Sequence, residues 1–225
     1  MKLSQRLAQD RETLRRLEGK ARGRFIWDYY IIPILVLAAA IVLGAIALGS
    51  GVRHGKTALY AVFVNAAPAE DGMHDAAALE ALLERGGVNM KGRHVDLTAD
   101  LYLGGEYDAG DDGRTIQVLA ALFGISDLDF FAADPATFDR YASQDAFADL
   151  SRLIEPELLD ALPEEDRITY ANSDGVTVTG GVVLHPGSPL HDAAYFFGDV
   201  AVGAAANGEN LDAAVALLRE LLRSK

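Results

Sequence analysis

The sequence predicts an α/β protein in which one N-terminal transmembrane helix precedes a single, mostly parallel sheet with helices on both faces. Two features of the 225-residue chain support this prediction. Residues 31–48 are apolar throughout except for Pro33 and Gly44. From residue 57 onward, β-rich apolar stretches alternate with helical stretches, which is typical of parallel sheets covered on both sides.

We expect the transmembrane helix to occupy residues 25–52. No residue in 29–52 is charged, and about 20 apolar residues suffice to cross the hydrocarbon core of a bilayer. Aromatic side chains such as Trp27 precede the apolar run, as at a membrane interface. A cleaved signal peptide is the alternative, because residues 45–47 read Ala-Ile-Ala. Its basic region and its apolar core would both be longer than usual, which favours a retained anchor.

The charge of residues 1–24 orients the predicted helix. Eight Lys or Arg residues but only four acidic residues precede Tyr29, and Lys and Arg are enriched on the cytoplasmic side of membrane helices. We expect residues 1–24 to form a basic, helical cytoplasmic segment, lying either on the inner leaflet or in solvent. Residues 53–56 are then a linker and residues 57–225 an extracytoplasmic α/β domain. The predicted localisation is the cell membrane, with a single pass and a cytoplasmic N-terminus.

Charge and cysteine content exclude several functions for the outer domain. Twelve basic and 29 acidic residues follow from Arg53 onward. Such a surface repels a phosphate backbone, so nucleic acid is not an expected partner. The chain contains no cysteine, which removes disulfides, thiolate catalysis and cysteine-based metal sites.

The outer domain contains five predicted strands and five predicted helices. Buried strands are expected where β-branched and aromatic residues gather between turn signals, and helices where apolar residues follow a 3.6-residue period between caps. The expected strands are 57–66, 92–101, 127–134, 176–184 and 196–205, the fourth with a bulge at its Gly-Gly pair. The expected helices are 74–87, 114–124, 135–143, 154–162 and 210–222.

The sequence offers no recognisable catalytic or metal motif. It lacks the G-x-S-x-G elbow, the H-E-x-x-H zinc motif and the glycine pattern of dinucleotide-binding loops. His185, Ser188, His191 and Asp192 have the residue types of a hydrolase site, but they fall within one Pro/Gly-rich turn and match no standard metal spacing. The acidic stretch 106–113 has the wrong spacing for a calcium loop. We therefore expect no enzyme activity, no cofactor and no metal.

Three stretches carry a resemblance to a known family. "LDFFAADPATFDRYASQDAFADLS" (128–151) contains a strand that ends in Asp134, a helix and a short apolar return. "VAVGAAANGENLDAAVALLRELL" (200–222) contains a strand, an Asn-containing turn and a helix, and "TGGVVLHPGSPLHDA" (179–193) contains a strand and a turn. These stretches resemble the type 2 extracellular solute-binding proteins of ABC importers. Asp145 stands where that family commonly has glycine before the return.

The resemblance implies only one lobe of that fold. A complete solute-binding protein closes two lobes on its ligand. The two dozen or so residues between Ser151 and Val176 are too few for a second lobe. The chain resembles the membrane-anchored, single-lobe relatives found in Gram-positive bacteria, with a helical anchor in place of a lipid.

The candidate ligand-binding residues are Asn65, Asp134 and Asn207, because open α/β sheets bind ligands at the carboxyl ends of their strands. Structural roles are the alternative: Asp134 as a helix cap and Asn207 within an ordinary turn. We expect a non-catalytic binding or interaction module, accessory to an ABC transporter, whose partners are the lipid bilayer and a membrane transporter or envelope complex. The alternative is a sensor or an envelope protein that docks on a membrane complex without binding a small solute. Whether a small molecule binds stays open.

Overall fold

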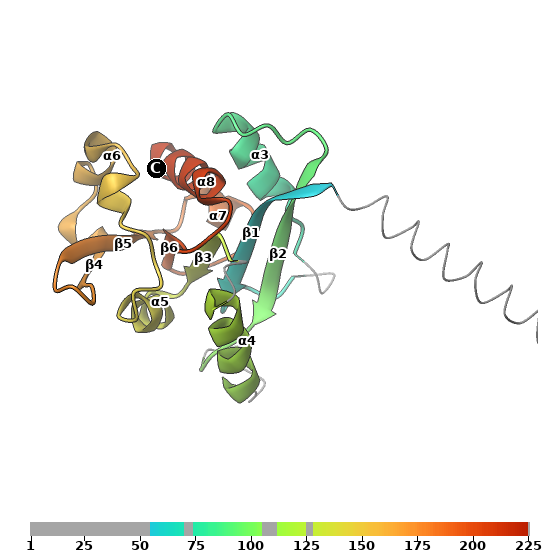
Figure 1. The fold of residues 1–225 in the computed structure, drawn as a ribbon. Coiled ribbons are helices and arrows are strands. Elements are labelled where there is room, and N and C mark those ends of the chain that lie inside the picture. The colour runs from blue at the N-terminus through green and yellow to red at the C-terminus, as the bar shows by residue number, and fades with distance from the viewer. Residues whose placement is uncertain (1–54, 70–73, 105–111, 125–127, 225) are drawn as a thin grey trace, which may run out of the picture. The chain divides into compact units, whose positions relative to one another are not determined.

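The computed structural model describes residues 55–69, 74–104, 112–124 and 128–224. All of them belong to the second of two compact units, Gly55–Lys225 (Figure 1). The predicted cytoplasmic segment and transmembrane helix lie outside the described residues. Within those described ranges, every helix is too short or too polar to span a bilayer.

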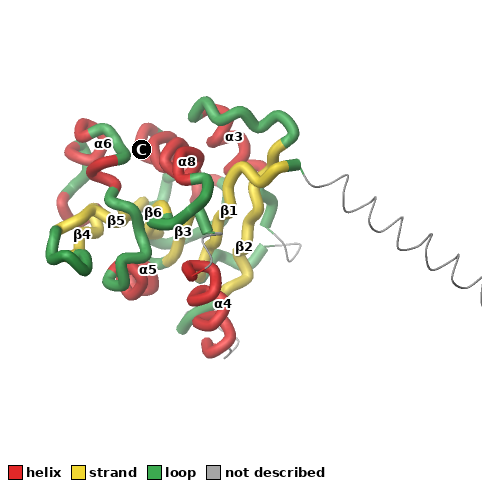
Figure 2. The backbone as a smooth tube through the Cα atoms, in the orientation of Figure 1, coloured by secondary structure: helices red, strands yellow, loops and turns green. Residues whose placement is uncertain are grey.

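One six-stranded sheet forms the centre of the domain (Figures 1 and 2). Its parallel part pairs the central strand β1 with β2 and with β3, and its antiparallel part adds β6, β5 and β4 in that order. Four of the six strands run in one direction, but three of the five pairings are antiparallel. The strand bounds are β1 Lys56–Val64, β2 Arg93–Leu101, β3 Phe130–Ala133, β4 Arg167–Ala171, β5 Thr177–Leu184 and β6 Val200–Ala204.

The α/β class, the single sheet and the covering helices are confirmed, whereas the pairing of the C-terminal strands differs from the expectation. β4 is an additional strand, joined to β5 by a tight turn at residues 172–176, and such a hairpin is antiparallel by necessity. Between β5 and β6, residues 185–199 contain only the four-residue helix α7, Pro189–Asp192, and no longer helix that would serve as a parallel crossover. β6 pairs antiparallel with both β5 and β3.

The helices cover both faces of the sheet. On one face lie α3 (Ala77–Arg85), α8 (Leu211–Arg223) and the short α6 (Pro156–Asp160), and on the other α4 (Asp112–Gly124) and α5 (Pro135–Ala142). The side chains of β1 alternate between the two cores, with Phe63 in the first and Val62 and Val64 in the second. This alternation explains why the strand is apolar along nearly its whole length, as expected for a strand buried on both faces. The two single-turn 3₁₀ helices are η1, Leu150–Arg152, and η2, Glu164–Asp166.

Two glycines allow α5 to approach the antiparallel part of the sheet. A Cβ atom at Gly181 would lie 2.5 Å from the Phe138 ring, and one at Gly203 would lie 2.7 Å from it. On its other side Phe138 stacks on Phe147, with ring centroids 4.1 Å apart. The predicted bulge lies at Gly180, where the pairing of β4 with β5 skips one residue. Of the Gly-Gly pair, Gly180 therefore forms the bulge, and Gly181 leaves the space that the Phe138 ring occupies.

A buried carboxylate joins the start of β3 to the start of α8. Asp129 is fully buried. One of its carboxylate oxygens accepts hydrogen bonds from the Tyr60 backbone N–H (2.8 Å) and the Asn210 side-chain amide (3.0 Å), and the other accepts one from the Asn210 backbone N–H (2.7 Å). Three donors satisfy the charge, so the group connects β1, β3 and α8 at one end of the sheet.

We predict that Asp129→Ala lowers the free energy of unfolding by about 2–4 kcal/mol, because the mutation leaves partly buried N–H donors without an acceptor. Asp139→Ala on the exposed side of α5 should change it by no more than about 0.5 kcal/mol. Pulse proteolysis in urea measures both variants. Equal stability of the two would show that the Asp129 network contributes nothing.

Candidate functional site

Asn65 and Asp134 meet at the end of the sheet where β1 and β3 finish. The Asn65 side-chain amide donates to the Asp134 carboxylate at 2.7 Å and to the Leu103 carbonyl at 3.0 Å, while its oxygen accepts from the Leu103 backbone N–H at 2.8 Å. Asn65 has a φ of 57°, a left-handed conformation that asparagine tolerates better than most residues. Both side-chain N–H groups of Asn65 are therefore occupied within the protein.

Asp134 also caps the helix that follows it. Its second carboxylate oxygen accepts from the Thr137 backbone N–H at 3.0 Å, and Pro135 begins α5 directly after it. The structural role considered for Asp134 is thus present. Asn65 and Asp134 line a pocket of about 260 Å³, together with Leu103, Gly104, Ala136, Thr137 and Arg140.

Asn207 lies at the other end of β3 from Asp134. It follows β6, and β6 runs antiparallel to β3, with Ala204 beside Phe130. Its side-chain amide donates to the Phe123 carbonyl at 2.8 Å, at the C-terminal end of α4. The prediction from the sequence assumed that β6 is one more parallel strand. For that reason it grouped Asn207 with Asn65 and Asp134.

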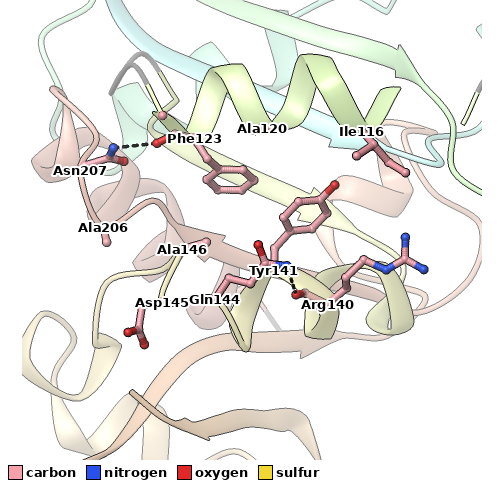
Figure 3. A pocket seen from close by; sticks show the side chains of 11 residues that line it. Ile116, Ala120, Phe123, Arg140, Tyr141, Gln144, Asp145, Ala146, Ala206 and Asn207 are labelled. Carbon is pink, nitrogen blue, oxygen red and sulfur yellow. Dashed lines mark hydrogen bonds between the residues drawn. The ribbon is translucent and has the colours of Figure 1, made fainter. Parts of the chain in front are cut away.

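A larger groove lies between α4 and α5 (Figure 3). We call it the α4–α5 groove. Its volume is about 570 Å³. Asn207 stands at one end, and Ile116 with Arg140 at the other. It is lined by Ile116, Ala120, Phe123, Gly124, Arg140, Tyr141, Gln144, Asp145, Ala146, Ala206 and Asn207.

The turn with hydrolase-like residue types is held together by internal hydrogen bonds. Ser188 Oγ lies 2.8 Å from His191 Nδ1, and His191 Nε2 lies 2.7 Å from the Gly198 carbonyl. Because a carbonyl only accepts, Nε2 carries the proton and Nδ1 accepts the Ser188 hydroxyl. Ser188 is 3% exposed, so a substrate has no access to it here. The pair fixes α7 and offers no open nucleophile.

His185 turns away from that pair and bridges two carboxylates. Its Nε2 lies 2.8 Å from Asp166 and its Nδ1 lies 2.8 Å from Asp199. The hydrogen bonds to Asp199 and Asp166 raise the pKa of His185. Among the described residues, no group of three or more His, Cys, Asp and Glu side chains is placed to hold a metal ion.

Phe197 is a surface feature that sequence reasoning missed. It is 69% exposed, whereas its neighbours Tyr195 and Phe196 are buried. The Ala67 backbone N–H, just after β1, donates to the Tyr195 carbonyl at 2.8 Å, so this loop lies at the end of the sheet that carries Asn65 and Asp134. The sequence placed Phe197 in a strand because apolar residues run on from 195, but β6 begins only at Val200.

We call the surface formed by Asn65, Asp134, Thr137 and Phe197 the strand-end surface. It contains the hydrogen-bonded side chains of Asn65 and Asp134 and the exposed ring of Phe197.

No protein-family model matches the chain, and neither curated proteins nor solved structures give a significant match. The relationship to solute-binding proteins therefore stays a prediction based on the three stretches described above.

We predict that His185 makes the stability of the domain depend on pH. Its folded-state pKa lies above the ordinary value of 6.5, so its stabilising contribution is complete below about pH 6.5 and is lost as the pH rises through the raised pKa. The melting temperature of the wild type should fall over that range, and the melting temperature of His185→Gln should fall less. Asp199→Asn should weaken the same dependence, because it removes the largest cause of the shift. Identical pH profiles in wild type and His185→Gln would contradict this assignment.

Proposed function

We propose that this protein is a membrane-anchored, extracytoplasmic binding or interaction module, non-catalytic and accessory to an ABC transporter. It resembles one lobe of a solute-binding protein and docks on its membrane partner through the strand-end surface. The observation that carries the proposal is that the hydrogen-bonded pair Asn65–Asp134 and the exposed Phe197 ring lie at the same end of the sheet.

The size of the strand-end pocket favours docking over solute capture. Sites for small molecules usually enclose about 300–1,000 Å³, and this pocket has about 260 Å³. Asn65 and Asp134 already hydrogen-bond each other, so a solute would have to replace a satisfied contact. The exposed Phe197 ring lies at the same end of the sheet, and aromatic side chains are enriched in the buried centres of protein interfaces.

The resemblance supports the proposal through its placement in the fold. The three stretches that carry it contain β3 with α5, then β5, and β6 with α8. These strands are neighbours in the sheet, in the order β3, β6, β5. The likeness therefore falls on one contiguous part of the domain. A sensor or an envelope protein that docks without any small ligand would use the same surface.

We predict that protease added to intact cells digests residues 57–225 and spares the N-terminal segment, because the basic residues before the span hold it on the cytoplasmic side. Antibody tags at the two ends, analysed by immunoblotting, report each product. Protection of the C-terminal tag would reverse the orientation. A mature chain beginning near Leu48 would show a cleaved signal peptide instead.

We predict that Phe197→p-benzoylphenylalanine photo-cross-links in cells to a transporter permease. The same substitution at Val176, which is 48% exposed in the β4–β5 turn, should give no such product. Phe197→Ser should weaken binding to the purified permease by about tenfold or more, as expected for an aromatic anchor. Val176→Ser is its matched control. Equal loss in both variants, or none in either, would exclude the strand-end surface.

A further inference from the structure

The α4–α5 groove has the size and the lining of a small-molecule site, and its evidence is independent of the strand-end surface. Its volume of about 570 Å³ falls within the usual range for ligand pockets, about 300–1,000 Å³. Figure 3 shows the Phe123 and Tyr141 side chains between the two helices.

The wall of the groove is aromatic and rigid. The Phe123 and Tyr141 rings stack with centroids 5.2 Å apart and an interplanar angle of 23°. Phe131 from β3 packs behind both, with centroids 5.4 Å from Phe123 and 5.8 Å from Tyr141. At one end Ile116 is 44% exposed. An apolar ligand body would cover surface that water now contacts.

Two donors at this end of the groove lack a protein partner. Within the described part of the chain, neither the Arg140 guanidinium nor the Tyr141 hydroxyl has a hydrogen-bond or ion-pair partner. Tyr141 is 7% exposed, and Figure 3 shows its hydroxyl pointing across the groove toward α4. In the described part of the chain, the buried side-chain polar atoms without a partner are His94 Nδ1 and Arg167 Nε, so the Tyr141 hydroxyl oxygen is open to the groove. Burial raises the pKa of Tyr141, with the Arg140 charge opposing this, so the hydroxyl keeps its proton at neutral pH.

The donors at the opposite end are already in use. The Gln144 side-chain amide donates to the Arg140 carbonyl at 3.1 Å, and that of Asn207 donates to the Phe123 carbonyl. Asp145 accepts from the Ser173 backbone N–H at 2.8 Å. Of the groups that line the groove, the guanidinium is the cation, and together with the Tyr141 hydroxyl it gives the Arg140 end two donors for an anion. The Asp145 carboxylate lies toward the opposite end.

We propose that the α4–α5 groove binds a small amphipathic carboxylate. The apolar body packs on Phe123, Tyr141 and Ile116, and the carboxylate accepts hydrogen bonds from the Arg140 guanidinium and the Tyr141 hydroxyl. A guanidinium matches a carboxylate in shape and charge and is commonly bidentate. Small inorganic anions gain only the polar contacts, because they cannot cover the apolar wall.

The test uses para-benzoylbenzoate as a photolabel on the full-length chain in phosphatidylcholine nanodiscs, with the neutral para-benzoylbenzamide as matched ligand. The carboxylate should label peptides from α4 and α5 saturably, and the amide should label them weakly. Arg140→Gln should lower affinity for the carboxylate by roughly tenfold to a hundredfold, the usual effect of losing a charge-assisted hydrogen bond, and leave the amide unchanged. Tyr141→Phe should lower the affinity for the carboxylate by a smaller factor than Arg140→Gln does.

A pair of neighbouring variants separates binding in the groove from binding elsewhere. Ala120→Trp fills the groove and should abolish labelling, whereas Ala121→Trp, on an equally exposed position outside the lining, should preserve it. Arg85→Gln on α3 is the control for removal of an exposed cation. Competition of phenylacetate and of octanoate with the photolabel shows whether the groove prefers a ligand with an aromatic or an aliphatic apolar part.

Three results would each overturn the proposal: absence of labelling at α4 and α5, labelling that survives Ala120→Trp, or equal labelling by carboxylate and amide. Because Ala120 lies outside the strand-end surface, loss of labelling there leaves the docking experiment unaffected.

Discussion

The position of α5 depends on the contact between the Phe138 ring and the backbone of the antiparallel strands. Gly181 on β5 and Gly203 on β6 leave the space that the ring occupies, and a Cβ at either position would overlap with it. Phe147 closes the other side by stacking. In a close-packed interior, a displacement of this ring would move the helix that carries it. Because α5 presents Asp134 at its first turn and Arg140 and Tyr141 at its last, the same contact fixes one wall of both candidate sites.

The sequence predicted the parts of the fold that depend on local signals. β1 was apolar enough to be assigned as buried on both faces, and Asp134-Pro135 marked the start of α5 because an N-cap before proline has few other uses. The structure confirms both. β4 was not predicted, because it is a short edge strand with no buried residue and its apolar pattern is weak. The residues of β6 carry no signal of its antiparallel direction, which the structure shows through its pairing with β3 and β5. Asn207 was placed at the wrong end of the sheet for that reason.

The candidate sites were harder to predict than the elements. Asn65 and Asp134 were predicted as candidates because each directly follows a strand, and adjacent parallel strands end together. The structure places the two side chains in hydrogen-bond contact. No comparable rule marks Phe197, since exposure of one aromatic in the run from 195 to 197 is decided by where β6 begins. In the sequence, Arg140 and Tyr141 look like two ordinary helix residues. Their significance comes from α4, which contributes Ile116 and Phe123 to the same groove.

A single domain can hold a small ligand only where its own elements flank the site on two sides. At the strand ends, one surface faces outward, and the pocket there is smaller than most ligand sites. In the proposed docking, a partner would supply the other wall. The α4–α5 groove already has two walls from one chain and needs no closing lobe. The two sites share the Arg140 side chain, which lines both pockets. The strand-end surface itself is formed by Asn65, Asp134, Thr137 and Phe197, so loss of ligand binding in the groove does not by itself remove the docking surface.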